Sequence, residues 1–245
     1  MDNSIIVALK NIVVDFDGEP ILTGLSLDIH DKEFVTLLGP SGCGKTTTLR
    51  VIGGFVEPRS GNVFFAGRDI TRLPPERRSM GLVFQDYALF ENMTVRQNVR
   101  YALRFHPQLR AQADERTDGL LRRLGLDGLH GALPARLSGG QRQALALVIA
   151  NMTDIDLLIL DEHTAALDPK SADTVMQLTD KFVRASKITT MMVTHNLRFA
   201  VEYGTRLIMM HEGKCIVDIR GEEKKKANVD DLLNIFYEIS IEVGN

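Results

Sequence analysis

The chain has 245 residues, of which 44% are hydrophobic and 25% are charged, the balance of an ordinary globular protein. Its formal net charge of −3 excludes a strong general attraction to nucleic acid or anionic lipid. Cys43 and Cys215 are its two cysteines, which excludes a disulfide framework and fits a reducing compartment.

The most apolar stretch, 144–160, contains Asn151, Asp154 and Asp156, so it is too short and too charged to cross a bilayer. We therefore expect a soluble chain whose membrane role, if any, comes through a partner. Lys224, Lys225 and Lys226 follow two glutamates and predict a solvated charged stretch.

Apolar runs and turn residues predict alternating strands and helices. The predicted strands cover 5–16, 21–29, 34–38, 62–66, 80–84, 155–160, 189–193, 207–210 and 215–219. The predicted helices cover 45–55, 94–105 and 113–124, the residues after Ser138, those after Asp168, and 228–237. The continuous apolar run at 155–160 is typical of a central parallel strand. These elements predict an α/β protein, with an inserted helical lobe at roughly 90–150.

A glycine-rich loop lies between the predicted strand 34–38 and the helix that follows. The loop fits the Walker A pattern, and its residues are Gly39, Pro40, Ser41, Gly42, Cys43, Gly44, Lys45 and Thr46. Glycines let backbone N–H groups surround a phosphate, and the helix N-terminus favours an anion. Lys45 would contact the β- and γ-phosphates, and the Thr46 hydroxyl would ligate Mg²⁺. The alternative is a chance glycine-rich turn, with Cys43 only filling space.

The predicted strand around 157–160 ends in two acids, Asp161 and Glu162, the form of a Walker B segment. Asp161 could hold Mg²⁺ through water, and Glu162 could activate the attacking water. Many buried strands end in acids, so the pattern alone is weak evidence. Its position after a Walker A loop is what favours the Walker B interpretation.

A third motif precedes the helix after Ser138. It consists of Leu137, Ser138, Gly139, Gly140 and Gln141. Ser138 is placed to cap the helix, and the two glycines leave backbone N–H groups open to a second phosphate contact. Taken alone, a plain helix cap would explain it.

Together these motifs resemble the ABC ATPase family over essentially the whole chain, in the family's order of Walker A, LSGGQ signature and Walker B. The resemblance implies a P-loop NTPase core with a mainly parallel sheet and an antiparallel β subdomain (1–88 and 153–245), with an inserted helical subdomain (89–152). It also implies ATP and Mg²⁺ as cofactors.

Single residues match further family positions. Gln85 resembles the Q-loop glutamine, 165–168 the D-loop, His195 the switch histidine and Phe16 the aromatic that stacks on adenine. By this resemblance Glu162, His195, Gln85 and Lys45 are catalytic. Thr46, Gln85 and Asp161 hold the metal. The residues that bind nucleotide are Phe16, Gly39, Pro40, Ser41, Gly42, Cys43, Gly44, Lys45, Thr46, Thr47, Ser138, Gly139, Gly140 and Gln141. The plainer alternatives for Gln85, Phe16 and His195 are a loop amide, a core aromatic and a helix-start histidine.

Members of the family pair head to tail, so Ser138 and Gly140 would serve the partner subunit's nucleotide. The implied partners are a second ATPase subunit, a membrane permease and a substrate-binding protein, with no nucleic acid. The implied location is the cytoplasmic face of the membrane.

The chain departs from the commonest family pattern at a few positions. Two arginines usual after the signature are absent, and His163 replaces a frequent proline. The region 39–105 resembles importer ATPases for polyamines, iron or phosphonates. The region from Leu137 onward resembles an importer group linked to aromatic amino acids.

Two other classes remain as alternatives. A soluble ABC ATPase of translation usually carries two ATPase units, and one of DNA repair carries a long coiled coil that is not seen here. A non-hydrolysing nucleotide-binding module is disfavoured by the presence of Lys45, Asp161, Glu162 and His195.

Overall fold

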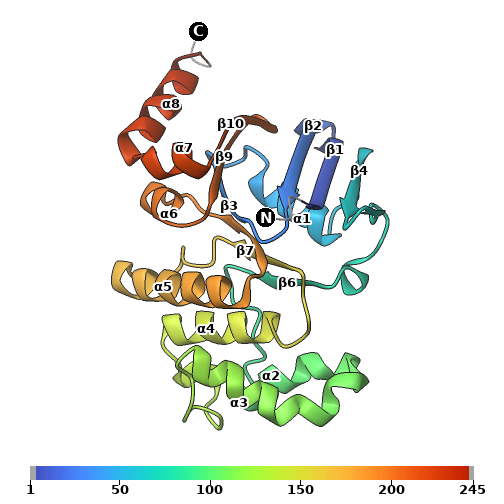
Figure 1. The fold of residues 1–245 in the computed structure, drawn as a ribbon, viewed down its shortest axis with the longest axis vertical. Coiled ribbons are helices and arrows are strands. Elements are labelled where there is room, and N and C mark those ends of the chain that lie inside the picture. The colour runs from blue at the N-terminus through green and yellow to red at the C-terminus, as the bar shows by residue number, and fades with distance from the viewer. Residues whose placement is uncertain (1–3, 243–245) are drawn as a thin grey trace. The chain divides into compact units, whose positions relative to one another are not determined.

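The computed structural model describes residues 4–242 and contains two compact units, each described below by itself (Figure 1). The first unit comprises residues 1–72 and 192–245, and the second comprises 73–191. The predicted division at 88/89 and 152/153 into core and helical subdomain stays a prediction.

The first unit contains a four-stranded antiparallel sheet in the order β2-β1-β4-β5. Its strands are β1 (Ile5–Phe16), β2 (Glu19–His30), β4 (Ser60–Phe65) and β5 (Arg68–Asp69). Asp17 and Gly18 join β1 to β2 with φ values of 52° and 87°, the geometry of a tight two-residue hairpin.

A second group of strands in this unit surrounds β3 (Phe34–Leu38), whose five residues are all buried. It pairs in parallel with β9 (Arg206–His211), which pairs antiparallel with β10 (Lys214–Arg220). The helices of the unit are α1 (Lys45–Gly53), α6 (Leu197–Glu202), α7 (Gly221–Lys226) and α8 (Val229–Glu242). Leu232 of α8 packs into a core cluster with Leu38 and Met209, which fixes α8 against the strands.

The second unit contains the parallel strands β6 (Met80–Val83) and β7 (Leu157–Asp161). Its helices are α2 (Val95–Tyr101), α3 (Ala113–Arg123), α4 (Gly139–Ala150) and α5 (Pro169–Ser186). Short 3₁₀ turns cover Pro75–Arg77, Ala102–Phe105, Pro107–Gln112 and Pro134–Arg136. In Figure 1, α4 lies between α3 and α5. Strand β8 (Thr189–Val193) spans the division between the units.

Local sequence explains where these helices begin. Ser138 and Thr94 each form a capping box with the residue three positions later, and Asp168 caps α5 with proline at its first position. The buried side of α5 follows helical spacing, with Ala172, Val175, Met176, Thr179, Phe182 and Val183. Asn228 accepts a hydrogen bond from the Asp231 amide, which confirms the predicted start of the last helix.

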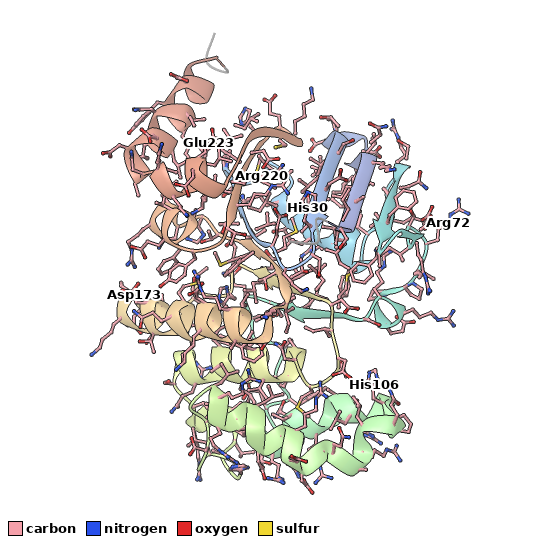
Figure 2. All side chains as sticks on the ribbon, in the orientation of Figure 1. His30, Arg72, His106, Asp173, Arg220 and Glu223 are labelled. Atoms are coloured by element: carbon pink, nitrogen blue, oxygen red, sulfur yellow. The ribbon has the colours of Figure 1, made fainter. Side chains whose placement is uncertain are left out.

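The structure corrects one expectation about the lysine-rich stretch. Residues 221–226 form helix α7 after Arg220, and Figure 2 shows Arg220 and Glu223 at this junction. Lys224 is buried and donates from Nζ to the carbonyl oxygen of Val201, so it is not solvated. An ammonium can be buried here because that carbonyl of α6 replaces part of its water shell.

One buried charge joins several segments of the first unit. The side chain of Arg206 is 3% exposed and donates to both carboxylate oxygens of Asp218, at 2.6 Å each. Its Nη1 also donates to the Asp28 carbonyl at 2.7 Å and to Glu33 at 3.1 Å. The hydrogen bond from Arg206 lowers the pKa of Asp218 below its usual range. Since that pKa is lowered, the stabilisation is present above the unfolded carboxyl's pKa and is lost as pH falls.

We predict that Asp218→Asn lowers the free energy of unfolding by about 3 kcal/mol near neutral pH, because it leaves the Arg206 cation with one carboxylate fewer in a buried site. Urea unfolding followed by circular dichroism measures this. Glu57→Gln is the matched control, because Glu57 pairs with Arg72 on the surface and its loss should cost under about 1 kcal/mol. Equal stabilities of the two variants would contradict the role given to Arg206.

Candidate functional site

The glycine-rich loop of the first unit bends tightly between β3 and α1. Gly39 has φ 155°, and a Cβ there would lie 2.4 Å from the Met210 carbonyl oxygen and 2.7 Å from Cys43 Sγ. Gly44 has φ 104°, and a Cβ there would lie 2.6 Å from a Leu22 methyl group. Both positions therefore require glycine, for lack of space as well as for backbone conformation.

Lys45 lies inside this loop with 6% of its surface exposed. Its Nζ donates to the carbonyl oxygens of Gly39 at 2.8 Å and Pro40 at 2.7 Å, and lies 3.7 Å from Cys43 Sγ. An ammonium has three donors, so two strong bonds leave one for an incoming anion. Cys43 is buried, and its carbonyl accepts from the Gly213 amide at 3.1 Å, which ties the loop to the β9–β10 turn.

Two more predicted residues belong to the same unit. Phe16 ends β1 and is 47% exposed, so it is not the core aromatic that the plainer interpretation required. His195 is exposed one residue after Thr194, whose amide donates to the Leu37 carbonyl at 3.2 Å. That bond places the start of the His195 segment beside β3, the strand that leads into the glycine-rich loop.

The remaining predicted residues belong to the second unit. Strand β7 ends at Asp161, and Glu162 follows with φ 47°, a left-handed conformation that is uncommon for glutamate. The Glu162 carbonyl accepts from the Ala165 amide at 2.9 Å, which closes the turn. Gln85 lies exposed in a turn one residue beyond Phe84, after β6, the parallel neighbour of β7.

His163 follows Glu162 and is fully buried. Its Nε2 lies 3.4 Å from the Thr179 hydroxyl of α5, and burial lowers its pKa to about 4. The imidazole is therefore neutral near pH 7, so it adds no charge beside the two acids. Through its contact with Thr179, His163 joins the segment after β7 to the buried side of α5.

The signature residues form the start of α4. The Ser138 hydroxyl accepts from the Gln141 amide at 3.2 Å, and the Gln141 side chain accepts from the Ser138 amide at 2.9 Å. A Cβ on Gly139 would lie 2.8 Å from a Leu167 methyl group and 3.7 Å from the Tyr87 hydroxyl. This glycine thus allows the segment 165–168 and the segment after Gln85 to approach the signature.

Sequence reasoning missed the role of Tyr87 in this arrangement. Its φ is 66°, and the guanidinium of Arg142 lies 5.4 Å from its ring centroid. Arg142 also donates to the Leu137 carbonyl at 3.0 Å. No local sequence signal indicates this contact, because it joins residues that are far apart along the chain.

Three comparisons bear on these features. The sequence pattern of a family described as ABC transporter matches residues 22–165. The tyrosine transport ATP-binding protein of Clostridioides difficile is 41% identical over 93% of this chain and 97% of its own length. The spermidine/putrescine import ATP-binding protein PotA of Photobacterium profundum is 40% identical over 87% of this chain, which spans 57% of that relative.

Solved structures agree with the sequence relatives. An ATP-binding cassette of an ABC transporter in its ADP conformation has a TM-score of 0.83 and 26% identity, covering 99% of this chain and all of the other. The cbiO1 protein of Clostridium perfringens, part of the ABC transporter complex cbiONQ, has a TM-score of 0.83 and 27% identity, covering 97% of this chain and 95% of its own. Both are similar to this chain over nearly its whole length.

Proposed function

The chain belongs to the family of ABC transporter ATP-binding proteins and is therefore an ATP-hydrolysing transport subunit, and we propose that its glycine-rich loop holds the phosphates of ATP. A soluble role in translation or DNA repair is not favoured, because the named relatives are transport subunits. The observation that carries the proposal is the buried Lys45 ammonium, enclosed by a loop too tight for side chains at Gly39 and Gly44.

The phosphate-binding residues that we propose are Gly39, Pro40, Ser41, Gly42, Cys43, Gly44, Lys45, Thr46 and Thr47. Backbone N–H groups of this loop and the start of α1 would face the anion, with Pro40 contributing none, and Lys45 would neutralise charge that develops on the transferred phosphoryl group. Phe16 would stack on the adenine, which is consistent with its half-exposed ring.

Mg²⁺ fits the residues present. Among residues 4–242 no group of three His, Cys, Asp or Glu side chains could hold a metal ion. Mg²⁺ in nucleotide sites is held by phosphate oxygens, water and one or two protein oxygens, so no such group is needed. The oxygen donors of Thr46, Gln85 and Asp161 are the ligands that we propose. The ion, when bound, would neutralise phosphate charge.

Glu162 is the general base in this proposal. Its carboxylate would take a proton from the attacking water, and His195 and Gln85 would orient the water and the γ-phosphate. Glu162 lies in a left-handed turn with φ 47°, and the next residue, His163, is buried.

A second ATPase subunit would complete the site. Ser138, Gly139, Gly140 and Gln141 would contact the nucleotide bound by the partner, and closure on ATP would drive the permease. Whether the pair is a homodimer or a heterodimer, the signature of each subunit would serve the other.

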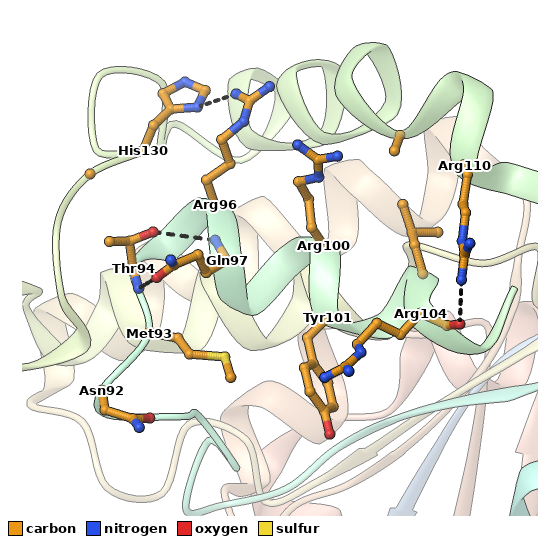
Figure 3. Close-up of a pocket in the computed structure, with 13 residues that line it drawn as sticks. Asn92, Met93, Thr94, Arg96, Gln97, Arg100, Tyr101, Arg104, Arg110 and His130 are labelled. Carbon is orange, nitrogen blue, oxygen red and sulfur yellow. Dashed lines mark hydrogen bonds between the residues drawn. The ribbon is translucent and has the colours of Figure 1, made fainter. Parts of the chain in front are cut away.

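The permease would dock on the helical part of the second unit. A cavity of about 990 Å³ lies there, and Figure 3 shows Arg100, Arg104 and Arg110 around it, with Met93 and Tyr101 as apolar surface. Arg104 lies over the Tyr101 ring, 5.6 Å from its centroid. Among residues 4–242 no helix is long and apolar enough to cross a membrane. The location that we propose for the chain is the cytoplasmic face of the membrane, where the permease would hold it.

The transport direction that we propose is import, with a substrate-binding protein as a further partner. The relatives named for tyrosine transport and for spermidine/putrescine import support this direction. They differ in cargo, and the greater coverage of the tyrosine relative favours an amino acid over a polyamine.

Lys45→Ala is expected to abolish ATP hydrolysis and to weaken nucleotide binding, because the loop loses the cation that faces the β- and γ-phosphates. A phosphate-release assay and titration with a fluorescent ATP analogue measure the two effects. Lys214→Ala, an exposed lysine of the same unit, is the control and should leave both unchanged. Near-normal turnover by Lys45→Ala would overturn the phosphate-loop assignment.

Glu162→Gln keeps the shape of the side chain but removes the base, so hydrolysis should fall by about two orders of magnitude while ATP still binds. Since hydrolysis reopens the pair, this variant should accumulate as an ATP-bound dimer on size-exclusion chromatography. Adding Ser138→Arg should disperse that dimer by blocking the partner's phosphate. Hydrolysis at the parental rate would show that Glu162 is not the base.

Membrane binding should need a protein partner. We expect no flotation with protein-free liposomes, and flotation with stripped native membrane vesicles that is lost after protease treatment of the vesicles. Arg104→Glu should weaken the vesicle binding by about tenfold, while Arg72→Glu, on the first unit, should not. Stable binding to protein-free liposomes would contradict docking through a permease.

A further inference from the structure

A second cavity, of about 400 Å³, is lined only by residues of the second unit, and none of its lining residues is a proposed nucleotide contact. It is enclosed by α3, by the end of α4 with the segment 153–155, and by the last turns of α5. Its lining combines buried polar atoms, a cation at the rim and an apolar wall. Together these three features define which chemical groups a ligand of this cavity would need.

Two buried polar atoms on the lining lack a hydrogen-bond partner within residues 4–242. They are Oδ1 of Asn151, a residue that is 5% exposed, and Nε of Arg116. One other nitrogen of each side chain has a partner: Asn151 Nδ2 donates to the Leu147 carbonyl at 2.8 Å, and Arg116 Nη2 donates to Asp154 at 2.6 Å. An unmet buried donor or acceptor costs about 1–3 kcal/mol, so these two atoms call for one donor and one acceptor from outside the chain.

Arg123 supplies the cation at the rim. Its guanidinium lies 5.4 Å from the Phe182 ring centroid and donates to the Ser186 hydroxyl at 3.5 Å, and it has no carboxylate partner in the part of the chain that the structure describes. Arg116 differs, since Asp154 already neutralises it. Arg123 therefore remains able to pair with a carboxylate brought by a ligand.

The wall of the cavity is apolar. Leu120 and Phe182 are 8% and 5% exposed, and Ile155 and Ile188 are partly buried beside them. Such a wall fits an aliphatic or aromatic side chain of the ligand and disfavours a polycation.

We propose that this cavity is a regulatory site for a free amino acid with an apolar or aromatic side chain. The ligand's ammonium group would donate to Asn151 Oδ1 and face Asp154. Its carboxylate would accept from Arg116 Nε and Arg123. Its side chain would lie against Phe182 and Ile155.

The position of Asn151 gives the site a route to catalysis. Asn151 is the C-cap residue of α4, and Ser138 of the signature is the N-cap residue of the same helix. A ligand that joins the C-terminal end of α4 to α3 would change the freedom of the helix that presents the signature. This consequence rests on the proposed function, whereas binding itself does not.

Isothermal titration of the nucleotide-free protein with L-phenylalanine tests the binding. We expect a saturable isotherm with a Kd of about 1 mM or tighter. L-Phenylalaninamide, which lacks the carboxylate, and 3-phenylpropionate, which lacks the ammonium, should each bind at least about tenfold more weakly, because each leaves one set of contacts unmade. Spermidine should not bind at this site.

Variants of the lining residues test whether the heat of L-phenylalanine binding arises in this cavity. Arg123→Gln and Asn151→Leu should each weaken L-phenylalanine binding by about tenfold or more, and Arg110→Gln, in a different cavity of the same unit, should not. Asn151→Leu removes the unmet acceptor but also the Nδ2 hydrogen bond to the Leu147 carbonyl, so the unfolding temperature of each free variant is measured beside its binding. This readout separates loss of binding from loss of folding.

The inference is overturned if L-phenylalanine gives no saturable heat up to about 10 mM, or if all variants bind it equally. Absence of binding in a protein with normal ATP hydrolysis removes this site and leaves the proposed function intact. Amino-acid binding in a protein that lacks ATPase activity would support this site and would count against the proposed function. Lys45→Ala should retain the amino-acid isotherm, because Lys45 belongs to the other unit.

Discussion

A polyphosphate can be held by a short loop only if backbone N–H groups approach it from several sides, and that approach leaves no space for side chains. At Gly39 and Gly44 a side chain would also collide with the protein itself, with the Met210 carbonyl and with a Leu22 methyl group. The constraint reaches further, since the loop is positioned by β3, by the Cys43–Gly213 hydrogen bond and by the β9–β10 turn. The buried network around Arg206, the first residue of β9, stabilises the same strands.

The second unit satisfies a comparable constraint around Gly139. A Cβ at position 139 would press on a Leu167 methyl group, so the glycine lets the segment at Leu167 lie close to the signature, while the Tyr87 hydroxyl is at ordinary contact distance. Since the signature carries the proposed partner contacts and Tyr87 follows Gln85, a shift in one of these segments would displace the others. The absent arginines after the signature do not affect this contact, because Arg142 remains and lies over Tyr87.

Much of this could be predicted from sequence where the signal is local. The apolar run before Asp161 predicted β7, the glycines predicted the phosphate loop, and Ser138, Asp168 and Asn228 predicted helix starts that the structure confirms. The predicted helix over 94–105 instead ends at Tyr101 and continues as 3₁₀ turns. Helices α6 and α7 were missed, because six residues give too short a period to detect. Burial of Lys224 and the contacts of Tyr87 and Leu167 depend on residues distant in sequence, which no local pattern records.

The hydrogen bonds of Lys45 to its own loop have a kinetic meaning. A lysine side chain free in solvent would lose about 2 kcal/mol of rotamer entropy on being fixed by a ligand. Here the carbonyls of Gly39 and Pro40 have already fixed it. An arriving nucleotide therefore meets an ordered cation and need not wait for the loop to rearrange, so its association should be governed by diffusion and orientation. Differences in affinity among nucleotides would then arise from their dissociation rates.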